Sequence, residues 1–412
     1  MRIKILAMSY LFPNRANPDY GIFVLNRLKA INGQADLKII NPIPWSPFHR
    51  FMGKYRGYEN IPAKDNIGGL EVYHPRFLSI PKYFKSVESI TYYLAVAPIV
   101  KKINEESGFD IVDLHWTYPD LPAGVRLAGK YKKKLLVTLR GKEAFHFQDA
   151  DLRKTIVKWC LKRVDNVVAL SSELKSMYET TTGLCGRTDV VRNGVDTSRF
   201  SFATMEDSRK KLGLDARDKI IVSVGSLTYG KGFDLLIKAV SIIIEKSKFE
   251  NLKLYIIGSE GHAGDFRKQL HQLVMDRGLS DCVVFMGQVP NDSLSVWYNA
   301  ADLFCLASRS EGSPNVLTEA LACGCPAVAT DVGSVREILE SEDDIGVCVK
   351  PDCDAALATG LSAVFSQIDA KVKQVPMGVQ NARQKKSGEF QGYDWAWCGR
   401  NVMDIYRKML DQ

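Results

Sequence analysis

The stretch from residue 303 to residue 330, LFCLASRSEGSPNVLTEALACGCPAVAT, most constrains what this chain can fold into. Residues 303–307 and 326–330 are short apolar runs of strand length, and a polar loop and a segment with helical spacing lie between them. A helix that joins two such strands makes them parallel neighbours with a right-handed crossover. The stretch therefore predicts one strand–helix–strand unit of an α/β fold.

Both ends of the helix in this unit carry signals. Ser313 is suited to be the N-cap, Pro314 to take the first helical position, and Gly324 to end the helix. Glu319 lies off the apolar stripe, so its side chain is expected to point away from the core. The stripe itself consists of Val316, Leu317, Ala320 and Leu321.

Two carboxylates flank the start of this helix. Glu311 lies just before it, and Glu319 lies about one to two turns inside it. The unpaired amides of the first turn are those of Asn315, Val316 and Leu317. These amides and the positive end of the helix dipole favour binding of a phosphate there. A phosphate between two hydroxyl-binding carboxylates indicates a sugar nucleotide. The alternative is that both glutamates are ordinary surface charges.

Length and composition limit the class of protein. The 412 residues suggest two or three domains, of which we predict two, and contents of 46% hydrophobic and 25% charged residues are ordinary for a soluble protein. No apolar stretch reaches the length of a spanning helix, and the N-terminus reads as a first strand rather than a signal peptide, which predicts a cytoplasmic protein. The net charge of +8 suits anionic ligands, an acidic membrane surface or nucleic acid without choosing among them.

Strand and helix signals alternate through both halves of the chain. We place a first domain at residues 1–200, a second at 201–390, and a final helix at 391–412 that crosses back to the first. The nine cysteines are scattered without CxxC pairs or histidines at zinc spacing, which predicts reduced thiols and no metal site.

The first half offers three candidate features. The strand KLLVTLRG leads into the polar loop GKEAFHFQDAD, which places four polar residues near the carboxyl end of the strand, each either structural or catalytic. They are Arg140, Lys142, Glu143 and His146. Gly21, before a helix at 22–31, either lets a diphosphate approach or serves as a simple turn glycine. A basic helix at 152–163 either covers the sheet or lies on an anionic membrane.

The second half has a glycine-rich loop in VGSLTYGKGFD. Gly225 ends a strand there, and Lys231 precedes a helix at a place where its ammonium can reach a phosphate as a point charge. The alternative is an ordinary surface lysine. The spacing is not that of a P-loop.

Taken together, these segments resemble the retaining glycosyltransferases of family 4. The resemblance rests on LLVTLRGKEAF, VVRNGVDTSRF, VGSLTYGKGFDLLIKA and the E-x7-E signature within EGSPNVLTEALACGCPAVATDVGSVREIL. It implies the GT-B fold, in which two Rossmann-like domains face each other across a deep cleft.

The resemblance also implies roles for individual residues. Glu311 would contact hydroxyls of the transferred sugar, Glu319 the ribose, and Val289 the base. Lys231 would neutralise the diphosphate, with no metal and no cofactor beyond the nucleotide sugar. The remaining donor-binding residues would be Gly21, Gly225, Ser226, Asn315, Val316 and Leu317.

Two positions depart from the family pattern. Many members carry His where this chain has Arg140, and Arg where it has Ser226. A guanidinium cannot act as a general base, so Arg140 would stabilise charge, and Glu143 or His146 would be left for proton transfer. The predicted catalytic residues are therefore Glu311, Arg140 and Glu143.

The predicted function is transfer of a sugar from a nucleotide sugar to a glycan or lipid-linked acceptor. The setting would be surface polysaccharide biosynthesis, such as exopolysaccharide or lipopolysaccharide, at the inner face of the cell membrane. The alternatives are a sugar-nucleotide epimerase of the same fold and a non-catalytic nucleotide-sugar-binding protein. The sequence leaves open the base, the sugar, the acceptor and the oligomeric state.

Overall fold

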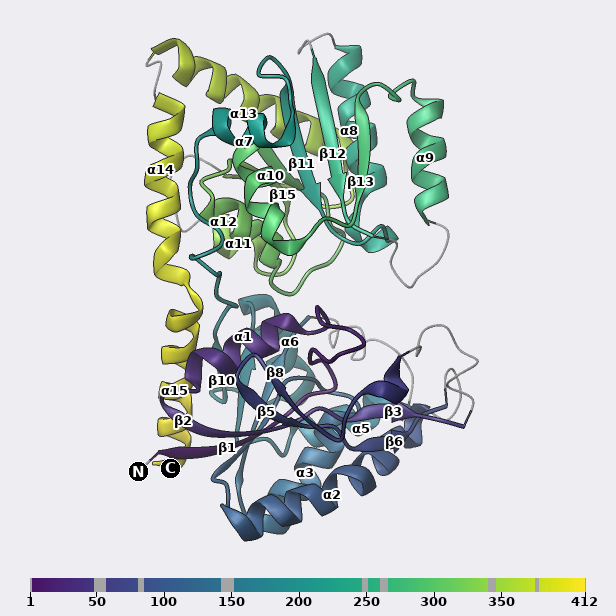
Figure 1. Cartoon of the computed structure of the whole chain (residues 1–412), viewed down its shortest axis with the longest axis vertical. Coiled ribbons are helices and arrows are strands. Elements are labelled where there is room, and N and C mark those ends of the chain that lie inside the picture. The colour runs from purple at the N-terminus through teal and green to yellow at the C-terminus, as the bar shows by residue number, and fades with distance from the viewer. Residues whose placement is uncertain are drawn as a thin grey trace. The chain divides into compact units, whose positions relative to one another are not determined.

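The computed structural model describes residues 2–47, 57–80, 85–141, 152–246, 251–259, 266–339, 346–374 and 378–411. The chain forms two compact units, one of residues 1–194 with 395–412 and one of residues 195–394. Each unit is built on a mainly parallel sheet that helices cover (Figure 1). The predicted α/β class with two Rossmann-like sheets is therefore confirmed.

The first unit holds a sheet in the order β10-β9-β8-β7-β1-β2-β5-β4, in which only the β4–β5 pair is antiparallel among the pairs described. From β1 the chain adds strands first on one side and then on the other, so the order reverses between β1 and β7. Ligands of open α/β sheets bind at the carboxyl ends of strands beside such a reversal. The strands are β1 (Ile3–Met8), β2 (Ala35–Ile40), β4 (Lys64–Ile67), β5 (Leu70–Tyr73), β7 (Ile111–Leu114), β8 (Lys134–Leu139), β9 (Asn166–Ala169) and β10 (Thr188–Val190), with β3 (Ile43–Trp45) and β6 (Arg76–Leu78) paired separately.

Helices cover both faces of this sheet. One core contains residues of α2 and α3, and the other contains residues of α1 and of the C-terminal helix α15. α15 packs against α1, so the end of the chain completes the first unit. The helices are α1 (Ile22–Ile31), α2 (Glu88–Glu106), α3 (Asp120–Tyr131), α5 (Leu152–Leu161), α6 (Ser172–Thr182) and α15 (Trp395–Leu410).

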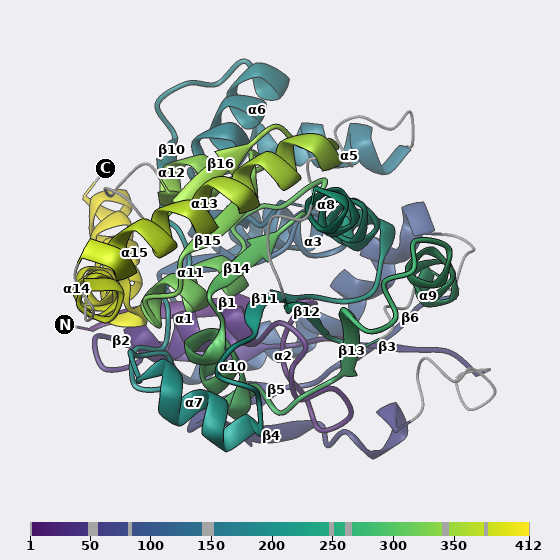
Figure 2. The ribbon, with the colours of Figure 1, turned by 90° about the horizontal axis from the view of Figure 1, so that it is seen from above.

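The second unit holds an all-parallel sheet in the order β13-β12-β11-β14-β15-β16, which reverses between β11 and β14. α8 and α13 pack side by side over one face (Figure 2), and α10, α11 and α12 contribute to the core on the other. The strands are β11 (Lys219–Val224), β12 (Leu252–Ile257), β13 (Val283–Gly287), β14 (Leu303–Leu306), β15 (Ala327–Thr330) and β16 (Gly346–Val349). The helices are α7 (Met205–Leu212), α8 (Phe233–Glu245), α9 (Phe266–Asp276), α10 (Leu294–Ala300), α11 (Asn315–Ala322), α12 (Val335–Leu339), α13 (Asp354–Gln374) and α14 (Gly378–Phe390).

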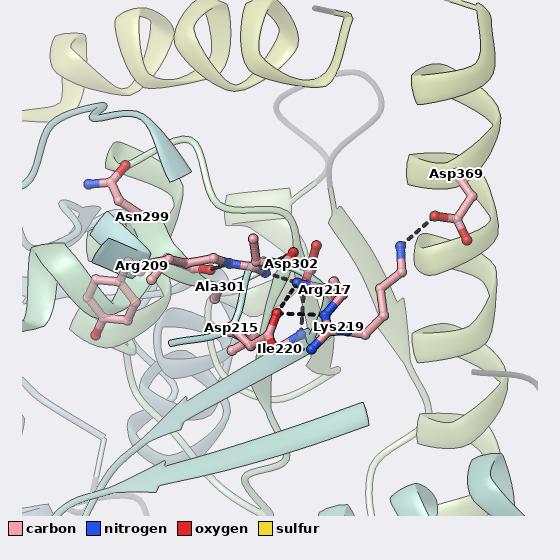
Figure 3. A network of polar contacts seen from close by, with 12 residues as sticks. Arg209, Asp215, Arg217, Lys219, Ile220, Asn299, Ala301, Asp302 and Asp369 are labelled. Atoms are coloured by element: carbon pink, nitrogen blue, oxygen red, sulfur yellow. Dashed lines mark hydrogen bonds and ion pairs between the residues drawn. The ribbon is translucent and has the colours of Figure 1, made fainter. Parts of the chain in front are cut away.

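A buried ion pair fixes α7 to this second sheet (Figure 3). Arg209 Nη2 donates to Asp302 Oδ2 at 2.8 Å, and Arg209 Nε donates to the carbonyl of Ala300 at 3.0 Å. The same carboxylate oxygen accepts the amide of Ile220 at 2.6 Å. Asp302 thus joins the start of β11 to α7, and the charge of Arg209 is matched where water does not reach it.

The start of α11 differs from the prediction. The helix begins at Asn315, and Pro314 rather than Ser313 occupies the N-cap with an extended backbone. The Pro314 carbonyl accepts the amide of Leu317 at 3.1 Å, so Leu317 is not one of the unpaired amides at this end. The assignment of Gly324 is confirmed, because it lies just after the helix in the left-handed conformation with φ +70°.

Candidate functional site

Three of the predicted residues meet at the strand-order reversal of the second sheet. Gly225 directly follows β11, Lys231 ends the short 3₁₀ turn Tyr229–Lys231, and Glu311 lies in the loop after β14. Lys231 Nζ lies 2.6 Å from Glu311 Oε1, and Ser308 Oγ donates to the same oxygen at 2.7 Å. A side chain at Gly225 would press on the stem of Lys231, since an added Cβ would come within 3.4 Å of it.

Gly232 explains why the loop after β11 can lie so close to β14. Its φ is +65°, and a Cβ at this position would lie 1.9 Å from the carbonyl oxygen of Ala307. Only glycine avoids both the unfavourable conformation and the collision. Lys231 is therefore held beside Ser308 and Glu311 by backbone packing as well as by its charge.

Arg309 clamps the loops around this pair and was not identified from the sequence. Its guanidinium binds Asp234 at the start of α8 through two hydrogen bonds of 2.8 and 2.7 Å, and binds Asp352 after β16 at 2.8 Å. It also donates to the carbonyl of Tyr229 at 2.7 Å and lies 3.8 Å from the centre of that ring. A planar group with five donors can join several loops at once, which a lysine cannot do.

The first turn of α11 follows Glu311 directly in the chain. Asn315 and Val316 are its first two residues, and no acidic side chain lies in that turn. The positive end of the helix dipole therefore meets no acidic side chain from its own first turn, which favours an anion there.

Glu319 is not the fully solvated surface charge that the alternative interpretation of the sequence proposed. It is only partly exposed, and Tyr298 of α10 donates a hydrogen bond of 3.2 Å to its Oε2. Burial raises the pKa of Glu319 to about 7, against the lowering effects of Tyr298 and Arg199. This burial comes from tertiary packing, because α10 packs against the face of α11 that carries Glu319. The sequence pattern of α11 by itself does not show that this face is covered.

Two further donor-site candidates lie in the same unit. Val289 follows β13 and is partly buried against the core beneath α10 and α11. Ser226 is partly buried after Gly225, and its carbonyl accepts the amide of Thr228 at 2.7 Å. Both lie in loops at the carboxyl edge of the sheet.

In the first unit, Arg140 follows β8 and is only 7% exposed. Its Nη2 lies 3.0 Å from His115 Nδ1, and its Nη1 donates to Asn193 Oδ1 at 3.3 Å. The guanidinium carbon lies 4.8 Å from the ring centre of Phe23 in α1. The structure thus gathers the ends of β7 and β8, the NGVD segment and the start of α1 around one cation.

Gly21 caps α1 with φ +72°, and an added Cβ would lie 2.6 Å from the carbonyl of Leu11. The local backbone therefore accounts for this glycine by itself. Lys142, Glu143 and His146 lie outside the described residues.

No group of three or more His, Cys, Asp or Glu side chains suited to a metal ion occurs within the described part of the chain. None of the nine cysteines, all of which lie in the described residues, forms a disulfide. The helices of that part of the chain include none that is both long and apolar enough to cross a bilayer.

Two family models match consecutive parts of the chain. The model described as "Glycosyl transferases group 1" matches residues 204–375, and the model described as "Glycosyltransferase Family 4" matches residues 59–199. A glycosyltransferase of Bacillus subtilis named for teichuronic acid biosynthesis is 26% identical over 370 residues, which cover 87% of this chain and 88% of that protein.

Solved structures share the whole architecture. Sucrose-phosphate synthase from Thermosynechococcus elongatus has a TM-score of 0.79 at 19% identity, with full coverage of both chains. The Anabaena protein HepE in complex with UDP-glucose has a TM-score of 0.70 at 19% identity, covering 99% of this chain and 100% of that one. These likenesses confirm the predicted GT-B fold.

Proposed function

Because the chain belongs to the family 4 glycosyltransferases, we propose that it is a retaining, metal-independent enzyme acting on a nucleotide sugar. The acceptor would be a glycan or a lipid-linked sugar, and the product part of a surface polysaccharide. The Bacillus subtilis relative, named for teichuronic acid biosynthesis, supports a polysaccharide setting. The HepE complex with UDP-glucose supports a nucleotide-sugar donor.

The Lys231–Glu311 pair carries this proposal. Both side chains are partly buried, with 28% and 12% of their side-chain surface exposed, and they meet at the strand-order reversal where ligands of this type of sheet bind. A diphosphate placed there competes with Glu311 for the ammonium. Once released, the carboxylate can accept hydrogen bonds from hydroxyls of the sugar while Ser308 still donates to it.

The donor would be held at three points. Lys231 and the first turn of α11 would bind the diphosphate, Glu311 the transferred sugar, and Glu319 the ribose hydroxyls. The C1–O bond breaks with its electron pair going to the diphosphate, and Lys231 stabilises the charge that develops there. Gly225, Ser226 and Val289 would line the nucleotide, and Gly21 would bind the diphosphate.

The reaction with retention would proceed by attack of the acceptor hydroxyl on the face that the leaving group vacates. The proton of that hydroxyl would pass to the departing phosphate oxygen, to Glu143 or to His146. Arg140 would stabilise negative charge beside the reacting centre, because a guanidinium cannot take up a proton at neutral pH.

A thermal-shift panel of UDP-glucose, GDP-mannose and ADP-glucose tests the donor class, since a ligand that binds only the folded state raises the melting temperature. We expect one nucleotide to stand out, and the nucleoside diphosphate then to be released slowly with water as acceptor. Isomerised nucleotide sugar in place of release would favour an epimerase. Binding without any turnover, with acceptors present, would favour a binding protein.

We also propose peripheral contact of α5 with an anionic membrane surface. Leu152 and Trp159 are 59% and 53% exposed, the guanidinium of Arg163 lies 3.5 Å from the Trp159 ring centre, and the helix holds no acidic residue. Apolar side chains beside cations are typical of interfacial helices.

Flotation with vesicles tests this contact. We expect the protein to float with vesicles that contain phosphatidylglycerol, and Trp159→Ser to weaken flotation. Met275→Ser serves as the matched control, because Met275 is 58% exposed on α9. A wild-type protein that ignores the anionic vesicles, or equal effects of both substitutions, would rule the contact out.

A further inference from the structure

A line of four buried polar side chains runs through the first unit from its last helix to Arg140. Tyr406 of α15 donates from its hydroxyl to Asp113 Oδ2 at 2.6 Å. His115 Nε2 lies 3.2 Å from the same oxygen, and His115 Nδ1 lies 3.0 Å from Arg140 Nη2. Tyr406, Asp113 and His115 are each at most 1% exposed.

The direction of each contact in this line follows from the chemistry of its groups. A guanidinium has only donors, so His115 Nδ1 must accept from Arg140 and carry no proton. The remaining ring proton then lies on Nε2, which is 3.2 Å from Asp113 Oδ2 but is not aligned for a hydrogen bond to it. Tyr406 donates to that carboxylate from the other side. The imidazole is therefore neutral, with one tautomer fixed by an anion and a cation on its two sides.

The charges of the line agree with this assignment. Burial lowers the pKa of His115, and the nearby Arg140 lowers it further, against the raising effect of Asp113. Burial alone would raise the pKa of Asp113, but His115 and the Tyr406 hydroxyl outweigh it, and the net direction is down. Arg27 is buried nearby but donates to neutral oxygens, of Thr138 at 3.1 Å and of the Val191 carbonyl at 3.4 Å.

We propose that Tyr406, Asp113 and His115 are positioning residues that fix the orientation of the Arg140 guanidinium at the carboxyl edge of the first sheet. These three side chains are called the positioning line below. The inference rests on the proposed function, because it takes Arg140 as a group at the reacting centre. Asn193 and the Phe23 ring bound the guanidinium on its other sides. Tyr406, which lies 293 positions from Asp113 in the chain, thereby helps to set the geometry around Arg140 in the first unit.

Substitution of Tyr406 tests the proposal against a purely structural role. Tyr406→Phe removes the hydroxyl that holds Asp113. Tyr178→Phe is the matched control, because Tyr178 is also fully buried in this unit and donates at 3.3 Å to the carbonyl of Leu161, away from Arg140. The readout is release of the nucleoside diphosphate from the nucleotide sugar chosen by the thermal-shift panel.

We expect both substitutions to lower the melting temperature by similar amounts, and only Tyr406→Phe to lower kcat, by about tenfold, as for loss of one hydrogen bond to a charged group. The KM for the donor should change little, since Lys231, Glu311 and Glu319, which would hold the donor, lie in the second unit. Equal kcat values for the two variants would overturn the proposal.

A second measurement needs no turnover. In protein labelled with ¹⁵N at its six histidines, His115 is expected to show an unprotonated Nδ1 and a protonated Nε2 between pH 6 and 8. Asp113→Asn presents an amide that can donate to Nε2, which should move the proton to Nδ1 and set it against the guanidinium. A charged His115, or a proton on Nδ1 in the wild type, would refute the positioning line. Failure of the wild type to turn over any nucleotide sugar would instead refute the proposed function.

Discussion

Replacing Glu319 by Gln should stabilise the second unit at pH 8 and much less at pH 5. The pKa of Glu319 is raised from 4.5 to about 7 in the folded protein, chiefly by burial. Between these values the unfolded chain has lost the proton and the folded chain has kept it, so the free energy of unfolding falls as pH rises. Each pKa unit corresponds to about 1.4 kcal/mol. The Glu319 carboxyl therefore lowers the free energy of unfolding by on the order of 3 kcal/mol above pH 7 and by about 1 kcal/mol at pH 5. A glutamine does not titrate and avoids this cost.

The assay is urea-dependent hydrogen exchange of peptides that span β14 to β15, since a chain of two units need not unfold in one step. Glu206→Gln is the control, because Glu206 is an exposed carboxylate of the same unit. If the stability gained from Glu319→Gln were the same at pH 5 and pH 8, the carboxylate would not be held in a raised-pKa environment, and this reasoning would fail.

The same carboxylate links the stability of the unit to donor binding. Ribose hydroxyls that donate to Glu319 would favour its charged form and lower its pKa, so binding of a nucleotide sugar near pH 6.5 should release protons. Calorimetry in buffers of different ionisation enthalpy measures this release. Glu319→Gln should abolish it, and an equal release from wild type and variant would contradict the ribose role.

Three further substitutions have expected outcomes of different kinds. Lys231→Ala should weaken binding of the nucleotide sugar by about 10- to 100-fold in calorimetry, as for loss of a charge-assisted hydrogen bond. Lys158→Ala is the control and should leave binding unchanged. Equal losses of affinity in the two variants would refute the role of Lys231 in binding phosphate. Glu311→Gln should lower the rate of nucleoside diphosphate release by at least about 100-fold, because this loop carboxylate would stabilise the transition state. The melting temperature should change little, since Glu311 is not part of the core. Unchanged turnover would remove Glu311 from the site. Asp302→Ala should cost about 3–5 kcal/mol in urea denaturation, since it leaves Arg209 buried without its anion, and a loss below 1 kcal/mol would show that water reaches this pair.

The sequence predicted best where local signals decide the structure. Residues 303–330 carry two apolar runs, a polar loop and a glycine after the helix. Each of these signals depends only on residues that are close together in the chain. The helix at 22–31 was predicted with the bounds that the structure has. The start of α11 was misplaced because Ser313 and Pro314 both suit a helix N-terminus, and only the hydrogen bonds to the Pro314 carbonyl show which of them is the cap.

The residues that the sequence did not reveal act through partners far along the chain. Arg309 binds acidic groups 75 and 43 positions away, and Tyr406 binds one 293 positions away. No spacing rule connects residues at such distances. The sequence also did not show that Glu319 is partly buried, because that burial comes from the packing of α10 against α11. A buried Asp and His two positions apart, as in DLHW, are the sequence signal that could have pointed to the positioning line.

The contacts of Arg140 bear on the route of the proton in the proposed reaction. Arg140 has no acceptor, and the lone pair of His115 Nδ1 is taken by Arg140 while His115 Nε2 faces Asp113. Neither group can receive the acceptor's proton unless the positioning line breaks. That leaves the departing phosphate oxygen, Glu143 or His146.

Glu143→Gln and His146→Gln, assayed with saturating donor, should decide among these three routes. A loss of kcat in one variant would assign the proton to that side chain, whereas an unchanged kcat in both would assign it to the leaving group. A histidine-like titration of kcat that persists in His146→Gln would mean that His115 leaves its contacts with Arg140 and Asp113 during turnover, contrary to their arrangement in the structure.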